Sequence, residues 1–594
     1  MFGKTIKFDE SRMYLQNLQG EADTNYIGYH VVFPEPDHKI VGEIVAIDAQ
    51  VIVIQLVGEI INGRFTNGVL KKPGMQTTAR IIFKSELECI LGNQNYLDRA
   101  NLLFGTSPIY KDYVVTADLN TFFANHFAII GNTGSGKSCG ITRLLQNVFY
   151  TSGDQTPKNA HIALFDAYGE YYDTFHDMEK FPDLHFKRYT TELQKGVEQG
   201  FSTQANLLRI PAYFLEVDDL AILLNCNHPT QLPALKKALD LVRIFTSSDP
   251  RAEDYKNDII AKTLLDILSS GKSSTQMRDQ VISVLTSYNT ETLNLNSVIR
   301  QPGYDRTFRQ CLLIDEQGKI NAMNQVVDFL QKYVQVDIDD IKLEGESTYT
   351  LSDLYFALEF ALVNEGAFTS EAAFDRNNIL KSRLQTIINS DQGKYFEYDD
   401  YITKHDYVQQ FFSTGNYGET AQLVDINLAF IDDKFAKVLT KIFSKLFFDF
   451  TTTLESRGSF SIHILLEEAH RYVQNDTDLE IIGYNIFDRI TKEGRKYGTI
   501  LGFITQRPAE LSKTALSQCS NFVVFRLFYP EDLEIVKGIS SNVTEETLTK
   551  IKTLHPGMGL TFGTAFKIPL LVNFPLPNPL PVSTSLKIDS VWYN

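Results

Sequence analysis

The chain has 594 residues, of which 43% are hydrophobic, so it can build two to four domains with cores of their own. Its net charge of -17 excludes a generally basic surface for nucleic acid, although a basic stripe inside a pore can coexist with an acidic exterior. Five scattered cysteines, no apolar leader and no run approaching about 20 apolar residues predict a soluble cytoplasmic protein with reduced thiols and no membrane contact.

The N-terminal part has the pattern of a small β domain. Residues 28–92 alternate short stretches rich in β-branched residues with turns that contain Gly or Asn-Gly. Several short strands of this kind are typical of a small barrel or sandwich. We assign residues 1–110 to an N-terminal β-barrel.

A glycine-rich loop follows at residues 131–138, with the sequence GNTGSGKS. Its spacing is that of a phosphate-binding loop, and it stands between an apolar strand at 128–130 and a helical pattern at 141–149. Backbone N–H groups and a helix N-terminus gather around an anion there. We expect Lys137 to contact the β- and γ-phosphates of ATP, and Ser138 to hold Mg²⁺. The nucleotide-binding residues are then Gly131, Asn132, Thr133, Gly134, Ser135, Gly136, Lys137, Ser138 and Cys139.

Apolar runs that resemble buried strands recur after the loop. They lie at 160–166, 422–430, 460–468, 499–505 and 521–527, and helical patterns separate them. Nearly continuous apolar strands indicate a parallel sheet covered on both faces. The intervening stretch has helical periodicity and many charges. We therefore expect an ATPase core at 111–200 and 416–568, interrupted by an inserted helical domain at 201–415.

Two later segments supply the rest of an ATPase site. The strand in HILLEEAHRY (463–472) ends in two carboxylates, of which we assign Glu467 to the Mg²⁺ side and Glu468 to activation of the attacking water. In FITQRP (503–508), Gln506 is the candidate sensor of the γ-phosphate and Thr505 is the second choice.

A basic cluster and a proline-rich tail complete the chain. ITKEGRKYG (490–498) fits either a solvated face or an arginine that bridges phosphate oxygens from a neighbouring subunit. Residues 569–594 form the tail, in which alternate prolines at 575–581 favour an extended strand-like segment. Such a segment suits a strap over a neighbouring subunit, with Trp592 as an interface anchor, and the alternative is a disordered end.

Taken in order, these motifs resemble a known family. GNTGSGKS, DAYGEY (166–171), LLEEAH, EGRKYGT, TQRP and LSQCSNFVVFRL (516–527) follow the order and approximate spacing of the HerA ATPases, relatives of the FtsK translocases. The resemblance covers about two-thirds of the chain. It implies an α/β fold, with a RecA-like P-loop ATPase core, an N-terminal small β-barrel and an inserted helical domain.

The resemblance also implies roles for individual residues. Arg495 would be an arginine finger that acts in trans, and Asp166 and Glu170 would lie near the nucleotide or the subunit boundary. Arg526 would be a second candidate for phosphate contact. Glu467 stands where Asp is commoner in the family, which makes its assignment to the metal less secure than that of Glu468 to catalysis.

At the level of function, the resemblance implies a homohexameric ring that uses ATP to move double-stranded DNA. A separate effector, a nuclease or a sirtuin-like protein, would dock at the barrel face, as in DNA processing or phage defence. Two alternatives stay open. The first alternative to a DNA motor is an ATP-regulated scaffold that activates an effector without processive movement. The second is a ring that moves protein.

Overall fold

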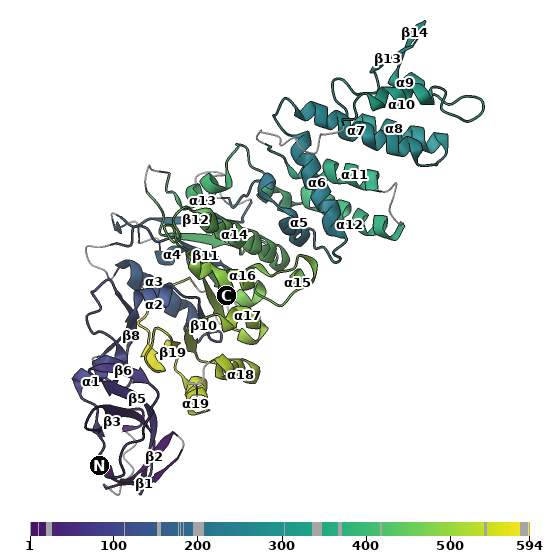
Figure 1. Ribbon diagram of the computed structural model, residues 1–594. Helices are drawn as coiled ribbons and strands as arrows, with labels where there is room; N and C mark the ends of the chain where they lie inside the picture. Colours follow the sequence, from purple (N-terminus) through teal and green to yellow (C-terminus); the bar gives the residue numbers. More distant parts are fainter. Residues whose placement is uncertain are drawn as a thin grey trace. The chain divides into compact units, whose positions relative to one another are not determined.

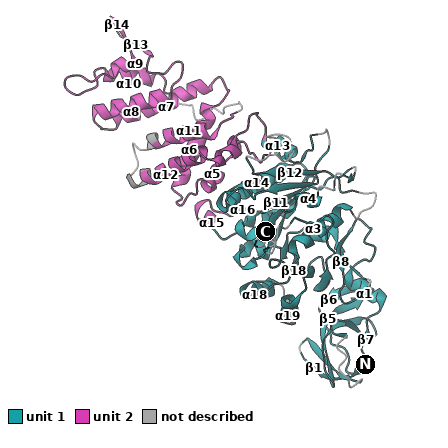
Figure 2. Ribbon diagram, turned by 180° about the vertical axis from the view of Figure 1, so that it is seen from behind, with its two compact units in different colours: residues 1–206, 404–476, 485–594 teal, residues 207–403, 477–484 magenta. Residues whose placement is uncertain are grey.

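The computed structural model describes residues 2–9, 11–18, 26–111, 113–150, 156–175, 178, 180–181, 183–193, 207–301, 303–335, 347–365, 371–415, 419–539, 543, 545–582, 588 and 592. The chain divides into two compact units (Figure 2). The first unit comprises residues 1–206, 404–476 and 485–594, and the second comprises 207–403 and 477–484. In the described part of the chain, no helix is both long and apolar enough to cross a membrane.

The N-terminal end of the first unit is an antiparallel sheet with strand order β1-β2-β5-β4-β3-β7, and β6 pairs with β5. Its strands are β1 (Phe2–Phe8), β2 (Arg12–Asn17), β3 (His30–Pro34), β4 (Lys39–Ile47), β5 (Val51–Ile61), β6 (Arg64–Asn67) and β7 (Arg80–Ile81). Buried aliphatic side chains such as Leu15, Val31 and Ile54 fill its inner face. No pairing joins β1 to β7 in the described residues, so the expected barrel is a half-barrel, and α1 (Lys84–Leu91) follows it.

An eleven-stranded mixed sheet forms the centre of the first unit, in the order β12-β15-β11-β16-β17-β10-β18-β19-β20-β8-β9 (Figure 1). The strands from β12 to β18 are parallel, and those beyond β18 are antiparallel. The bounds are β8 (Asn101–Thr106), β9 (Val114–Asp118), β10 (Phe127–Ile130), β11 (Ile162–Asp166), β12 (Phe186–Thr190), β15 (Leu423–Asn427), β16 (Ile462–Glu467), β17 (Thr499–Thr505), β18 (Asn521–Phe525), β19 (Met558–Gly563) and β20 (Leu570–Asn573).

Helices cover this sheet on both faces, because every residue of β10, β11, β15, β17 and β18 is buried. They are α2 (Leu119–Phe123), α3 (Lys137–Tyr150), α4 (Tyr172–Phe175), α13 (Lys404–Phe412), α14 (Asp433–Thr453), α16 (Ile486–Glu493), α17 (Lys513–Ser517), α18 (Pro530–Ile539) and α19 (Glu545–Thr553). The continuous apolar runs of the sequence therefore correspond to a doubly covered, largely parallel sheet, as expected. β8, which the sequence placed within 1–110, pairs with β20 of this sheet.

The second unit is helical, which confirms the predicted insertion. Its helices are α5 (Val217–Leu223), α6 (Gln231–Phe245), α7 (Ala252–Ser269), α8 (Ser274–Ser287), α9 (Phe308–Cys311), α10 (Met323–Gln331), α11 (Leu351–Glu365), α12 (Glu371–Ile388) and α15 (Asp478–Ile481). A two-stranded hairpin of β13 (Val298–Gln301) and β14 (Tyr304–Thr307) precedes α9.

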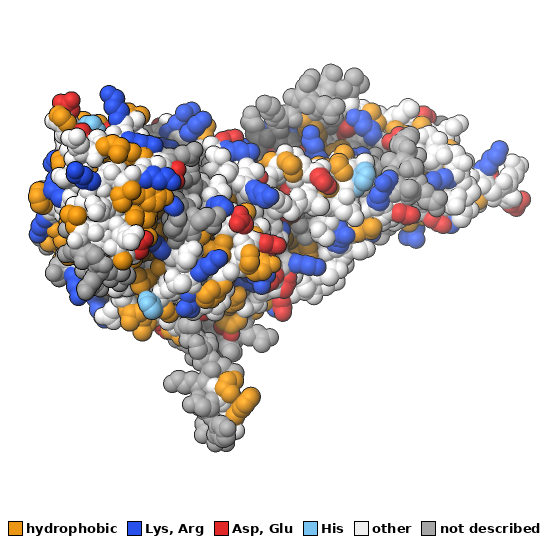
Figure 3. Space-filling view, turned by 90° about the horizontal axis from the view of Figure 1, so that it is seen from below, with side chains coloured by type: hydrophobic (Ala, Val, Ile, Leu, Met, Phe, Trp, Pro, Cys, Tyr) orange, Lys and Arg blue, Asp and Glu red, His pale blue; other side chains and the backbone are white. Residues whose placement is uncertain are grey.

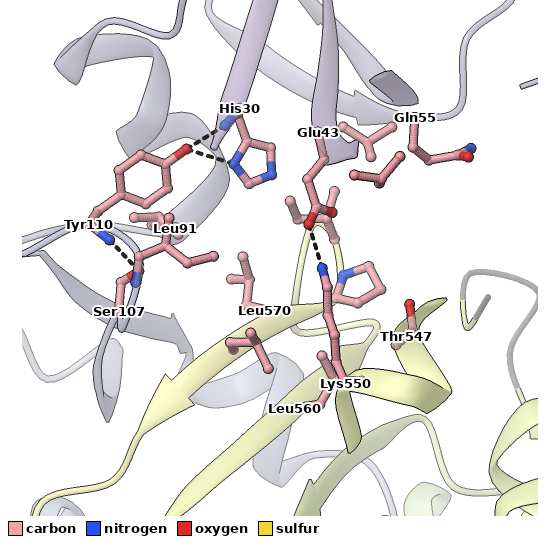
Figure 4. Close-up of a pocket in the computed structure, with 16 residues that line it drawn as sticks. His30, Glu43, Gln55, Leu91, Ser107, Tyr110, Thr547, Lys550, Leu560 and Leu570 are labelled. Atoms are coloured by element: carbon pink, nitrogen blue, oxygen red, sulfur yellow. Dashed lines mark hydrogen bonds and ion pairs between the residues drawn. The ribbon is translucent and has the colours of Figure 1, made fainter. Parts of the chain in front are cut away.

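A small pocket marks the place where the half-barrel meets the central sheet (Figure 4). Its volume is about 90 Å³, and it is lined from β3, β4 and β5 on one side and from α19, β19 and β20 on the other. Lys550 Nζ donates to Glu43 Oε1 across it at 2.6 Å. The Tyr110 hydroxyl accepts from the His30 backbone N–H at 2.7 Å and lies 2.8 Å from His30 Nδ1.

His30 is buried beside this hydroxyl. Burial lowers the pKa of His30, which favours the neutral form of its ring.

Buried neutral histidines predict that the protein loses stability in mild acid. His126 is 3% exposed and accepts from the Leu501 N–H at 2.9 Å, and burial lowers its pKa to about 4. Below about pH 6.5 His126 becomes protonated in the unfolded chain, whereas it stays neutral in the folded chain. At pH 5 this difference lowers the free energy of unfolding by about 2 kcal/mol. His126→Asn keeps a hydrogen-bond acceptor. Between pH 7.5 and 5 we expect its free energy of unfolding, measured with urea, to fall by about 2 kcal/mol less than that of the parent. Exposed His405→Gln is the control, and equal declines in both variants would contradict the assignment.

Candidate functional site

The glycine-rich loop is held by the ends of the two strands beside it. Gly131 N donates to Thr505 O at 3.1 Å, and Asn132 N donates to Arg526 O at 3.0 Å. These two acceptors end β17 and follow β18, which flank β10 in parallel register. The loop therefore has a fixed place at the carboxyl edge of the sheet, directly before α3.

A segment from the C-terminal part of the chain, around Gly557, also contacts this loop. Gly557 N donates to Ser135 O at 3.0 Å. Gly136 has φ +95°, and a Cβ at this position would lie 2.6 Å from Gly557 N. Glycine is required here both by the backbone conformation and by the close approach.

Lys137 and Glu468 form a buried ion pair at the centre of the site. Lys137 Nζ donates to Glu468 Oε1 at 3.1 Å, and the two side chains are 5% and 3% exposed. Glu468 follows the last residue of β16 and has φ +47°, a conformation that non-glycine residues rarely adopt. The strained turn directs its carboxylate at the phosphate loop, and strain of this kind is concentrated at functional sites.

Gln506 joins the loop to this carboxylate. Its Nε2 donates to Glu468 Oε1, and its Oε1 accepts from Thr133 Oγ1 at 2.5 Å. The candidate sensor thus contacts both parts of the site through its side chain. Thr505 contacts the loop only through its backbone oxygen, and its Oγ1 lies 3.2 Å from His470 Nδ1. His470 Nδ1 is also 3.3 Å from Glu468 Oε2.

Glu467 is the last residue of β16, directly before Glu468, and it is buried. Its Oε2 accepts from Ala167 N at 3.1 Å. Burial and, next, the charge of Asp166 raise its pKa well above the usual value. The described ranges contain no group of three or more His, Cys, Asp and Glu side chains that could hold a metal ion. Mg²⁺ in nucleotide sites needs only one or two protein oxygen ligands beside phosphate and water, and Ser138 and Glu467 match that set.

The loop after β11 brings two further predicted residues to the site, with different surroundings. Asp166 accepts the backbone N–H groups of Tyr168, Gly169 and Tyr171 at 3.1, 2.7 and 3.1 Å, so its carboxylate shapes the loop. Glu170 is half-buried on that loop. Burial and Asp166 raise its pKa, and its own charge helps to raise the pKa of Cys139 at the start of α3.

The two predicted arginines lie at opposite edges of the sheet. Arg526 follows β18, supplies the acceptor for Asn132 N, and stacks over the Phe528 ring at 5.1 Å. Arg495 is exposed in the short 3-10 helix Gly494–Lys496, before the start of β17. The seven residues of β17 span about 20 Å, so Arg495 is far from the phosphate loop of its own chain.

Sequence reasoning missed two residues near the site. His470 was visible in LLEEAH, but only the structure shows its contact with Glu468. Asp425 stands inside the apolar strand β15, fully buried and 3.4 Å from Arg188 Nε, and burial raises its pKa well above the usual value. A carboxylate within an apolar run was its only signal.

Comparison with known proteins shows that the chain resembles the HerA family. Residues 104–447, more than half of the chain, match the family model described as the central domain of the helicase HerA. The chain is 37% identical to the probable helicase MJECL08 of Methanocaldococcus jannaschii over 109 residues, which are 18% of this chain and only 21% of that protein. It is 22% identical to the DNA double-strand break repair helicase HerA of Sulfolobus acidocaldarius, over 86% of this chain and 75% of that protein. Among solved structures, VirB4 of Thermoanaerobacter pseudethanolicus covers 82% of this chain with 98% of its own, at 11% identity and a TM-score of 0.45.

The Lys137–Glu468 pair predicts strong energetic coupling between its members in the absence of nucleotide. Removal of one partner leaves the other charge buried and unpaired. The losses in unfolding free energy caused by Lys137→Met and by Glu468→Gln should therefore add up to more than the loss in the double variant. A double-mutant cycle measured by urea unfolding should give a coupling free energy of about 1–3 kcal/mol. The exposed pair Lys158–Asp183, also at 3.1 Å, is the matched control and should show no measurable coupling. Additive effects at Lys137 and Glu468 would show that the pair does not form.

Proposed function

The chain belongs to the HerA helicase family and is a P-loop ATPase, and on that premise we propose that it is a homohexameric ring motor that translocates double-stranded DNA. The observation that carries the proposal is the constellation of Lys137, Glu468 and Gln506 at the carboxyl edge of the sheet. The proposed phosphate-binding lysine and the proposed polar sensor both donate to Oε1 of the proposed base. ATP hydrolysis needs these three groups.

Residues of this chain account for each part of the hydrolysis. The N–H groups of the loop bind the phosphates, and Lys137 exchanges its contact with Glu468 for one with the β- and γ-phosphates. Glu468 Oε1 is then free to accept a proton from the attacking water, while Gln506 keeps the carboxylate beside the γ-phosphate. Ser138 and Glu467 would hold Mg²⁺, which neutralises charge on the phosphate oxygens.

The position of Arg495 supports a role in trans. An exposed arginine at the amino edge of the sheet does not reach its own site, but it is free to enter the site of a neighbour in a ring. A guanidinium placed there stabilises the charge of the transition state. The proposal thus requires an oligomer, and a homohexamer is the assembly that the family resemblance implies.

DNA and an effector are the proposed partners. The HerA relative of Sulfolobus acidocaldarius is named for repair of DNA double-strand breaks. On the face drawn in Figure 3, basic side chains are interspersed with acidic and hydrophobic ones. We therefore place the DNA in a central channel, since screening confines the field of an acidic exterior to about 8–10 Å. A nuclease or sirtuin-like effector at the half-barrel, acting in cytoplasmic DNA processing or phage defence, completes the proposal.

The function is tested by ATP hydrolysis with and without double-stranded DNA. We expect DNA to stimulate hydrolysis by the parent chain, and neither Lys137→Ala nor Glu468→Gln to turn over ATP. Lys137→Ala should fail because it loses phosphate binding, whereas Glu468→Gln should retain bound ATP because only the base is lost. Nucleotide binding is measured separately for each variant. If DNA does not change the rate of hydrolysis, the scaffold alternative is favoured. If Glu468→Gln hydrolyses ATP at the normal rate, Glu468 is not the base.

Arg495 is tested by mixing variants. Arg495→Ala should bind ATP normally yet lose about 10³-fold or more in hydrolysis rate. Rings mixed from Arg495→Ala and Glu468→Gln subunits should regain part of the activity, because some interfaces then combine an intact base with an intact arginine. Lys496→Ala, next to Arg495 in the same 3-10 helix, is the control and should hydrolyse ATP normally. No recovery in rings verified to be mixed would contradict the role in trans.

A further inference from the structure

The proline-rich tail lies on its own chain where the structure describes it. Beyond β20, Gln146 of α3 holds the tail through both ends of its side-chain amide: Oε1 accepts from Asn578 N at 3.0 Å, and Nε2 donates to Pro579 O at 3.2 Å. Val582 N then donates to Glu170 O at 3.0 Å. We call residues 575–582 the C-terminal strap. The sequence predicted a strap over a neighbouring subunit, but these contacts are made within one chain.

The strap is anchored on α3 itself, through Gln146, and on the loop after β11, through the backbone oxygen of Glu170. Gln146 is 1% exposed and follows Cys139 by seven residues, which is two helical turns or about 10 Å along the same side of the helix. Glu170, at the other end, lies on the loop that leaves the carboxyl end of β11, and this is the edge of the parallel sheet at which the phosphate loop also stands. Residues 580–582 bridge these two anchor points, so they run from the third turn of α3 toward the edge of the sheet that carries the phosphate loop.

The nucleoside of a bound nucleotide leaves the phosphates in this region. In a phosphate loop, the α- and β-phosphates rest on the backbone at the start of the helix, and the ribose and base extend beyond them. Leu580 and Val582 of the strap are 53% and 45% exposed, and are therefore available for contact with a ligand. Arg143, one turn after Cys139, has an Nε without a hydrogen-bond partner among the described residues.

We propose that the C-terminal strap forms one wall of the nucleoside subsite, contacting the ribose and base of the nucleotide bound to the phosphate loop of the same chain. The inference rests on the proposed ATPase function. Gln146 is a positioning residue, because it acts by holding the backbone of Asn578 and Pro579. The prolines reduce the conformational entropy that the strap loses when it orders beside a ligand, which favours binding.

The proposal is tested by comparing ATP with inorganic tripolyphosphate, which has the phosphates but no nucleoside. Both are titrated in the presence of Mg²⁺ against the full chain, a chain ending at Phe574, and a chain ending at Val582. The first truncation removes the strap, and the second is the matched control, since it removes only residues beyond the strap. We expect the chain ending at Phe574 to bind ATP at least about tenfold more weakly while its affinity for tripolyphosphate is unchanged. The chain ending at Val582 should match the parent for both ligands.

Gln146→Leu gives the same comparison without truncation. Leucine fills a similar volume but makes neither hydrogen bond to the strap, so ATP affinity should fall while tripolyphosphate affinity holds. Unchanged ATP affinity in both strap variants, or equal losses for both ligands, would overturn the proposal, because the strap would then be absent from the subsite or serve only to stabilise α3. A parent chain that binds tripolyphosphate and ATP equally would also overturn it. A parent that binds neither would instead refute the ATPase function.

Discussion

The buried contact between Lys137 and Glu468 is the interaction on which the geometry of the site depends. A lysine ammonium and a carboxylate, each almost fully removed from water, are stable only as partners. The pair joins the end of β16 to the start of α3 across the intervening β17. The left-handed backbone at Glu468 and the contact from Gln506 both serve this placement. In the proposed mechanism, nucleotide phosphates offer Lys137 a stronger partner, so that ATP binding would release Glu468 as the base.

The phosphate loop is also tied to the half-barrel through one short segment. Lys550 on α19 pairs with Glu43 of β4, and Gly557, seven residues later, donates to Ser135 of the loop. The neutral His30 and Tyr110 lie at the same junction (Figure 4). The half-barrel and the phosphate loop are therefore joined by contacts from the same segment, residues 550–557.

Local features of the fold and site were predictable from the sequence, and features set by long-range pairing were not. The loop at 131–138, the acidic pair at 467–468 and Gln506 follow fixed spacings after apolar strands, and strand order brings them together. By contrast, β8 enters the central sheet through its pairing with β20, which no local pattern encodes. The resemblance implies that Asp166 lies near the nucleotide or the subunit boundary, but only the structure shows that its carboxylate accepts three backbone N–H groups of the following loop.

The tail shows the same distinction. Its prolines exclude a helix, and residues 575–582 form neither helix nor strand. The partners of the tail are the buried side chain of Gln146 and the backbone oxygen of Glu170, and neither carries a signal in the sequence. His470 is a different case, because its contact with Glu468, two residues earlier, is local but depends on the left-handed backbone at Glu468, which the sequence does not indicate.

The most direct measurement is a structure of the full chain with Mg²⁺ and a non-hydrolysable ATP analogue. The account predicts that Lys137 Nζ lies about 2.7–3.2 Å from phosphate oxygens and has left Glu468, while Gln506 still contacts the carboxylate. A structure with the analogue on the loop and Lys137 still paired with Glu468 would contradict it.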